Sequence, residues 1–247
     1  MLQRLVVYGL LVIALIFTAE TPRTQREEIG IVVFKAQDKQ INPYQEEYQK
    51  LLYPTVRIEA GNSTGSGVVI GNDECGFRNA EYNYIITAAH VVNDNSLVFV
   101  YFFDYAGNSS LEIGWVTITD TQKDLALIKV KTDKPYPYKS KLADKDYVPY
   151  IFSPVWVVGA SLGCQPRPTR GEVTFTDKTH WEINAPIVPG NSGGPVFNAN
   201  TYELIGIAVW VRTYNGQLVT TMAGIIPIQQ IYEFIQSNPK NSTNSKN

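Results

Sequence analysis

The sequence predicts an all-β protein made of two six-stranded antiparallel β-barrels, with a candidate functional site between them and a helix at the C-terminal end. From Tyr53 onward, short runs rich in Val, Ile, Tyr and Thr alternate with Gly, Asn, Asp and Pro. These runs form two sets of about six, separated by a linker-like stretch at 132–146. About six short strands are enough to close a small barrel, and closure removes free sheet edges. The halves show no sequence repeat, so the duplication rests on strand number alone.

The N-terminal segment favours export. Met1–Arg4 is basic, and residues 5–19 are apolar except for Thr18, which is typical of a signal peptide. About 15 residues is shorter than the roughly 20 that a membrane span needs. A cut after Ala19 would place Phe17 where a small residue is expected, so a cleaved signal and an uncleaved membrane anchor both stay open. Either one predicts an exported chain that touches the membrane only through this segment.

Residues 20–52 are expected to be a linker with a strand-like run at 29–34 and a short helix at 43–52. Asn42 is the expected N-cap, Pro43 the first helical residue and Gln45 the capping-box partner. We expect this helix to lie on the surface, ahead of the main domain at 53–237.

Each barrel is defined by its runs of strand-forming residues. The first barrel, about 53–140, is expected to contain strands at Val56–Glu59, Gly67–Ile70, Tyr84–Thr87, Leu97–Phe103, Trp115–Thr119 and Leu125–Val130. The second, about 147–237, is expected to contain strands at Val155–Val158, Glu172–Thr176, Trp181–Asn184, Pro195–Phe197, Leu204–Val211 and Leu218–Ala223.

The C-terminal helix is expected to begin after Pro227 and to pack one face on the second barrel. That face carries Ile228, Ile231, Tyr232 and Ile235. Residues 238–247 are polar and are expected to form a disordered tail.

Composition narrows the possible functions. A chain of 247 residues can bury a sizeable core. Its net charge of −2 gives no electrostatic footprint for nucleic acid. The two cysteines, Cys75 and Cys164, belong to no metal-binding pattern, so we expect no metal site and no cofactor. They can form one disulfide or remain free thiols.

The stretch Pro189–Pro195 predicts a nucleophile loop centred on Ser192. Its three glycines allow backbone angles that other residues avoid, and its two prolines restrict the backbone. Such a loop presents a hydroxyl together with backbone N–H groups, as acyl transfer requires. A glycine-rich surface turn is the alternative interpretation of this stretch alone.

Two other residues fit the chemistry of an activated serine. His90 follows a buried strand and three small residues, Thr87, Ala88 and Ala89. Asp124 precedes the apolar run 125–128, where an unpaired carboxylate would be costly.

We therefore predict that His90 takes the proton of Ser192 and that Asp124 orients His90. Asp120 is a competitor for Asp124 but lacks such a strand behind it, and His180 is expected to be structural.

The oxyanion hole is expected to lie at Gly190, Asn191 and Ser192, with the N–H groups of Gly190 and Ser192 as donors.

These motifs resemble the trypsin/chymotrypsin-like serine peptidases. The resemblance covers about 53–235 and is carried by Thr87–His90, Asp124–Leu127 and Gly190–Pro195, in the family's order. Within that fold the sequence is similar to the HtrA/Deg branch. That similarity is carried by Asn191 and the segments 184–190 and 65–68.

The resemblance implies a serine endopeptidase that acts on polypeptides, including unfolded proteins, and a homotrimer as one assembly. It places Val188, Val211 and Gly224 in the primary specificity pocket, with Pro186 at its base and Trp210 beside it. Because the base carries no acidic residue, we expect cleavage after small or medium apolar side chains. Trp210 lies on a strand whose edge is expected to pair with the substrate backbone.

Two departures from the wider family bear on regulation. Asn191 stands where trypsin-like zymogens carry an aspartate, so activation by a new N-terminus is not expected. The sequence ends shortly after its last predicted helix, so no PDZ domain is expected. A catalytically silent binding module and an esterase using the same triad are the alternative functions.

Overall fold

The computed structural model describes residues 42–71, 81–106 and 108–237. The expected export segment, the strand-like run at 29–34 and the C-terminal tail lie outside the described residues. From Tyr44 onward the chain belongs to one compact unit.

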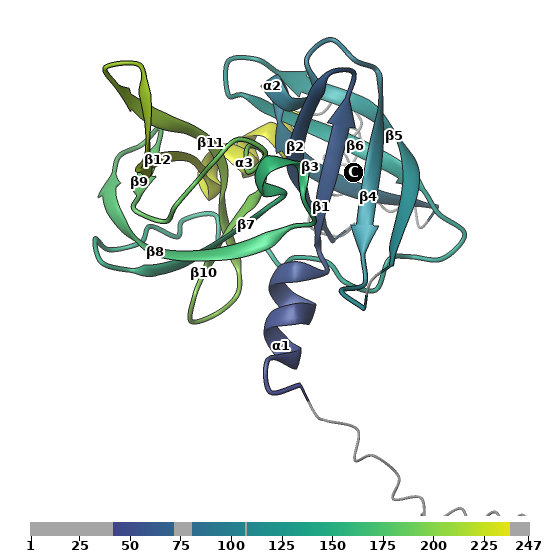
Figure 1. Ribbon diagram of the computed structural model, residues 1–247, viewed down its shortest axis with the longest axis horizontal. Coiled ribbons are helices and arrows are strands. Elements are labelled where there is room, and N and C mark those ends of the chain that lie inside the picture. Colours follow the sequence, from purple (N-terminus) through teal and green to yellow (C-terminus); the bar gives the residue numbers. More distant parts are fainter. Residues whose placement is uncertain (1–41, 72–80, 107, 238–247) are drawn as a thin grey trace, which may run out of the picture. The chain divides into compact units, whose positions relative to one another are not determined.

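Two closed antiparallel barrels make up this unit, which confirms the predicted fold class (Figure 1). The first has the strand order β1-β2-β3-β6-β5-β4, and the second has the order β10-β11-β12-β9-β8-β7. The strands of the first barrel are β1 (Thr55–Ala60), β2 (Ser63–Ile70), β3 (Tyr82–Ala88), β4 (Leu97–Phe103), β5 (Ser109–Asp120) and β6 (Leu125–Lys131). Those of the second are β7 (Pro154–Gly159), β8 (Arg167–Thr176), β9 (Trp181–Ile183), β10 (Pro195–Asn198), β11 (Leu204–Tyr214) and β12 (Gln217–Pro227).

Every strand expected in the two barrels is present, but several are longer than expected. β5 begins at Ser109 rather than Trp115 because it pairs with β4 along the whole length of β4. β11 and β12 extend as a polar hairpin as far as Tyr214 and Gln217. The sequence underestimates such arms because neither has a buried apolar face: Leu111 and Ile113 of β5 are exposed, and the β11–β12 arm is mostly polar.

The first helix differs from its prediction. α1 (Gln45–Glu47) continues into a π-helical turn at Tyr48–Leu52. The prediction that Asn42 caps this helix is wrong. The N-cap residue is Tyr44, and no side chain makes a capping hydrogen bond to the helix. The prediction that this helix lies on the surface is also wrong for its C-terminal end, where Leu51 and Leu52 are buried.

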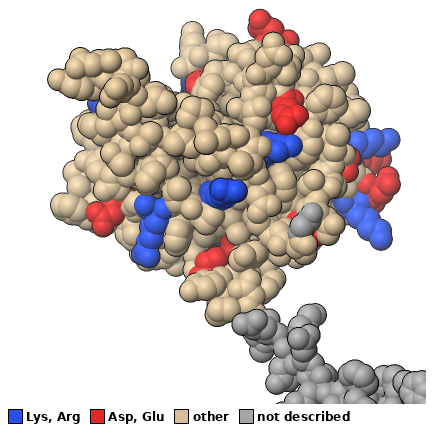
Figure 2. All heavy atoms as spheres, in the orientation of Figure 1, with Lys and Arg blue, Asp and Glu red and all other residues tan. Residues whose placement is uncertain are grey.

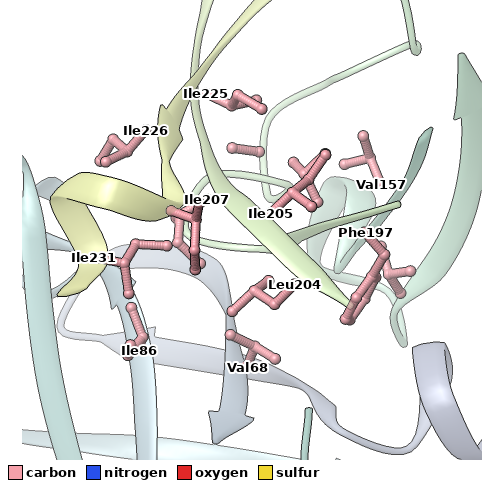
Figure 3. Packing of buried hydrophobic residues seen from close by; sticks show 14 of the residues in the cluster. Val68, Ile86, Val157, Phe197, Leu204, Ile205, Ile207, Ile225, Ile226 and Ile231 are labelled. Atoms are coloured by element: carbon pink, nitrogen blue, oxygen red, sulfur yellow. The ribbon is translucent and has the colours of Figure 1, made fainter. Parts of the chain in front are cut away.

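Alternate residues of β2, β3 and β6 serve two different cores. Val69, Ile85 and Ile128 belong to the cluster inside the first barrel. Val68 and Ile86 point the other way, into the larger cluster shared with the second barrel. Figure 3 shows them beside Leu204, Ile207 and Ile231. Because both faces are buried, these strands read as continuous apolar runs.

The last helix, α3 (Ile228–Gln236), begins after Pro227 as predicted. Ile228, Ile231 and Ile235 are buried, and Phe234 joins them although it was not expected to. The helix packs against β11 and β12. Within the described ranges, no helix has the length and apolar character needed to cross a membrane.

Candidate active site

The three predicted catalytic residues lie at the ends of three different elements. His90 is in α2 (Ala89–Val92), the single turn that follows β3. Asp124 stands immediately before β6, and Ser192 stands in the loop before β10. His90 and Asp124 therefore come from the first barrel and Ser192 from the second, as the sequence predicts.

His90 and Asp124 are joined through two bonds. The His90 ring Nδ1 lies 2.7 Å from Asp124 Oδ2, and the His90 backbone N–H donates to Asp124 Oδ1 over 2.9 Å. Asp124 adopts a left-handed backbone conformation, with φ +54°, and its carbonyl accepts the Ala89 N–H. The carboxylate is thereby held beside Nδ1, where it fixes the imidazole tautomer.

Asp120, the competing carboxylate, is engaged elsewhere. Its Oδ1 accepts the backbone N–H groups of Gln122 and Lys123, and its Oδ2 lies 3.6 Å from Lys123 Nζ. The carboxylate that His90 hydrogen-bonds is therefore that of Asp124, not Asp120.

Ser192 is set against the first barrel through its backbone. Its carbonyl accepts the N–H of Ser66 in β2 over 2.8 Å. A Cβ added to Gly65 would lie 2.6 Å from Val91, the neighbour of His90, and 3.0 Å from the Ser192 carbonyl oxygen. Ser192 therefore lies beside the turn that carries His90. Within the described residues no hydrogen bond joins the two side chains, and such bonds are commonly long before substrate binds.

The glycines around Ser192 are required by close backbone approach. Gly190 has φ +96°, and a Cβ there would lie 2.2 Å from the Ala160 carbonyl oxygen. Gly193 has φ +80°, and a Cβ there would lie 2.2 Å from the Thr87 hydroxyl. Both positions exclude any side chain, so the glycine-rich stretch is a packed crossing of two chain segments rather than a free surface turn.

The backbone N–H groups of this loop have different roles. The Asn191 N–H donates to the Val188 carbonyl over 3.1 Å, so it is used inside the turn. The N–H groups of Gly190 and Ser192 have no hydrogen-bond partner among the residues described. These two are therefore the groups available to a developing oxyanion.

A polar network behind the loop was missed by sequence reasoning. The Ser66 hydroxyl donates to the Gly190 carbonyl and accepts the Ala160 N–H, each over 2.7 Å. The Ser161 hydroxyl donates to Asn191 Oδ1 over 2.7 Å. Asn191 is fully buried, and its Nδ2 has no partner in the described part of the chain. The small residues that flank Ser66 were the available signal of this close approach.

A second polar tie comes from Arg57 in β1. Its Nη1 donates to the Gly163 carbonyl over 2.7 Å. In the same turn, the Leu162 N–H donates to the Pro189 carbonyl over 2.8 Å, next to Gly190. The loop with the two free N–H groups is thus supported from the first barrel. Nothing in the sequence pattern around Arg57 indicated this contact.

The five residues expected at the specificity pocket fall on one loop segment and two neighbouring strands. Val188 and Pro186 precede the nucleophile loop, and the other three lie on β11 and β12, where Trp210 pairs with Gly224 and Val211 with Ala223. A Cβ on Gly224 would lie 1.9 Å from Trp210 Cε2, so the indole lies directly over this glycine.

His180 and Cys164 lie outside the catalytic cluster. The Nδ1 of His180 lies 3.1 Å from Asp177 Oδ2, and its ring lies against Phe175, with 5.4 Å between the ring centroids. Cys164 is an exposed free thiol, and Cys75 lies outside the described residues.

Comparison with known proteins places this fold and site in a class. The model of the trypsin-like peptidase domain matches residues 65–207, a range that contains His90, Asp124 and Ser192.

Over 168 residues the chain is 30% identical to a probable periplasmic serine endoprotease, DegP-like, from Pseudomonas putida strain W619, aligning 65% of this chain with 32% of that protein. A putative protease Do-like 14 from Arabidopsis thaliana is 28% identical over 178 residues, covering 62% of this chain and 36% of that protein. The chain thus spans about a third of the length of these relatives.

Solved structures share the fold. A serine endoprotease from Yersinia pestis aligns with a TM-score of 0.62 at 21% identity, covering 79% of this chain and 68% of that one. The HtrA-type protease AlgW with tripeptide aligns with a TM-score of 0.63 at 22% identity, covering 79% and 63%.

The class that the double barrel and the matched range define is that of the trypsin-like peptidase domains. The chain belongs to the trypsin-like peptidase family, and over that domain it is similar to proteases of the HtrA/DegP type, as the sequence resemblance indicates.

The close approach at Gly193 gives a first prediction. Gly193→Ala should lower the free energy of unfolding by about 2 kcal/mol more than Gly216→Ala does. Gly216 has nearly the same φ, +75°, but no atom within 4 Å of its Cβ position. Its alanine variant therefore suffers the backbone strain without the steric clash. Chemical denaturation of the two variants measures the difference. Equal destabilisation would mean that the loop can move away from Thr87.

The buried amide at Asn191 gives a second prediction. Asn191→Asp should destabilise the fold by about 2 kcal/mol at pH 7, because no described cation compensates a carboxylate there. Burial raises the pKa of the introduced carboxyl, whereas the unfolded chain releases that proton near pH 4. The penalty should therefore grow as the pH rises above about 4 and vanish below it. Thermal melts of wild type and variant from pH 4 to 8 measure it; a pH-independent difference would contradict it.

Proposed function

We propose that this chain is a serine endopeptidase that cleaves peptide bonds through an acyl-enzyme, with Ser192 as nucleophile, His90 as general base and acid, and Asp124 as the orienting carboxylate. The observation that carries the proposal is the 2.7 Å contact between His90 Nδ1 and Asp124 Oδ2. That contact leaves His90 Nε2 as the nitrogen that accepts a proton from a hydroxyl.

The steps follow from the positions of these groups. His90 takes the Ser192 proton as the hydroxyl attacks the substrate carbonyl, and returns it to the leaving amine. Asp124 stabilises the imidazolium that forms between these steps. The free N–H groups of Gly190 and Ser192 receive the oxyanion, at about 3 kcal/mol of transition-state stabilisation for each donor. Asn191 contributes its buried side chain to the loop rather than its N–H group.

The substrate preference that we propose is for small or medium apolar side chains before the cleaved bond. Pro186, Val188, Val211 and Gly224 offer no charge to a Lys or Arg side chain. Trp210 is partly exposed on β11, where a substrate backbone can pair with the strand.

The setting that we propose is outside the cytoplasm, with polypeptides as substrates. Relatives named periplasmic endoproteases support it, as does the apolar segment expected at 5–19. Self-association as a trimer is a further proposal, and the exposed apolar stretch 148–152 offers a surface for it.

The triad is tested by two substitutions. Ser192→Ala should abolish labelling by a fluorophosphonate probe and cleavage of an unfolded protein. Asp124→Asn should lower kcat by about 10⁴-fold, because the imidazole then takes the wrong tautomer. Asp120→Asn is the matched control and should keep wild-type kcat. Wild-type protein that neither labels nor cleaves would favour a silent binding module, and labelling with ester but no peptide cleavage would favour an esterase.

The preference is tested with matched peptides. Peptides with Val or Ala before the cleaved bond should give kcat/KM at least about tenfold above the same peptide with Arg, since no acidic group stabilises the guanidinium. Steady-state kinetics on the three peptides measures the ratio. Preference for Arg would overturn the assignment of the pocket.

A further inference from the structure

The outer face of β4 and β5 carries a row of exposed apolar side chains that the catalytic site does not use. In the antiparallel register Leu97 pairs with Trp115, Phe99 with Ile113, and Tyr101 with Leu111. We call these six residues the apolar ladder. Apart from Tyr101, each exposes between 38% and 54% of its surface. Large apolar side chains gathered on a surface mark an interaction site.

The ladder has one closed end and one open end. At the closed end the Arg57 guanidinium lies 4.1 Å from the centre of the Tyr101 ring, and the Tyr101 hydroxyl donates to Glu59 Oε2 over 3.0 Å. Arg57 and Glu59 are themselves paired over 3.2 Å. The other end, at Leu97 and Trp115, has no such cover among the described residues.

The open end meets the cleft beside the catalytic histidine. A cleft of about 640 Å³ has His90, Asp124, Ser96 and Val116 among the residues that line it. Ser96 precedes Leu97 and Val116 follows Trp115, so the cleft lies at the strand ends next to the first rung, with the side chains of Ser96 and Val116 on the opposite face of the sheet from the ladder. A chain bound at His90 reaches the ladder where it passes over this edge of the barrel.

We propose that the apolar ladder is an exosite for apolar segments of unfolded polypeptide substrates, reached through the His90 cleft. The proposal rests on the proposed peptidase function. Unfolded chains expose the apolar side chains that folded proteins bury, and such side chains gain by leaving water. The ladder carries no charge and is about 14 Å long from its first rung to its third. It fits a short extended segment without demanding a particular sequence.

Area favours a substrate over a second copy of this chain. The five half-exposed side chains present on the order of 500 Å² of apolar surface. A stable interface between two folded partners takes roughly 800 Å² from each. Figure 2 shows mostly uncharged residues over the middle of this face, with blue and red residues gathered at the right edge of the view.

The test compares a long substrate with a short one on the full chain. Phe99→Ser/Ile113→Ser should raise KM for reduced, alkylated α-lactalbumin about tenfold, because two apolar contacts are lost. The kcat/KM for a short Val-containing chromogenic peptide should stay within about twofold, because the peptide ends before the ladder. Leu218→Ser is the matched control: Leu218 is similarly exposed but lies on the β11–β12 hairpin, and its variant should change neither value.

A binding assay separates this proposal from the peptidase proposal. In a Ser192→Ala background, fluorescence anisotropy with labelled α-lactalbumin should show a Kd about tenfold higher once Phe99 and Ile113 are also replaced. This difference in Kd is expected even if the wild type has no peptidase activity, because the assay measures binding alone. An unchanged Kd and KM would overturn the exosite. If the variant with Phe99 and Ile113 replaced has a lower molecular mass than the wild type in light scattering, the ladder binds a second copy of this chain instead. If the variant loses binding to phosphatidylglycerol vesicles that the wild type shows, the ladder binds a bilayer.

Discussion

Ser66 is the residue that fixes the position of the two barrels relative to each other. Its hydroxyl joins the Ala160 N–H to the Gly190 carbonyl, and its own N–H donates to the Ser192 carbonyl. Its carbonyl accepts the Thr87 hydroxyl over 2.6 Å. A single fully buried residue on β2 therefore ties together, through its side chain and its backbone, the end of β3, the end of β7 and the nucleophile loop. The unpaired groups that its loss would leave are costly in a buried setting.

The apolar core and these polar ties do different work. The shared cluster around Val68, Ile86 and Leu204 supplies most of the attraction between the barrels, but burial of apolar surface has no direction. Hydrogen bonds at Ser66 and Arg57 select one placement among those that the apolar surfaces would allow. The catalytic groups belong to different barrels, so this placement decides the geometry of the site.

The sequence predicted those features that depend on local pattern. Apolar runs such as 125–128 gave the strands, and the order His90, Asp124, Ser192 gave the candidate site. It could not predict contacts that are made only after the barrels meet: the Ser66 network, the Arg57 bond to Gly163 and the internal use of the Asn191 N–H. The predicted cap at Asn42 is wrong because the first helix is positioned by the burial of Leu51 and Leu52 and not by a capping side chain. β5 was cut short because its outer face is apolar where alternation predicts polar residues.

The crowding at Gly190, Gly193 and Gly194 also has a consequence for how this chain can change over generations. A Cβ at any of the three would lie within 2.4 Å of a backbone or side-chain atom. Every single-nucleotide missense change in a glycine codon introduces a Cβ. No single-nucleotide missense mutation at these three positions is therefore structurally neutral. At Gly216 in the exposed hairpin, where the Cβ position has free space around it, a substitution costs backbone strain alone.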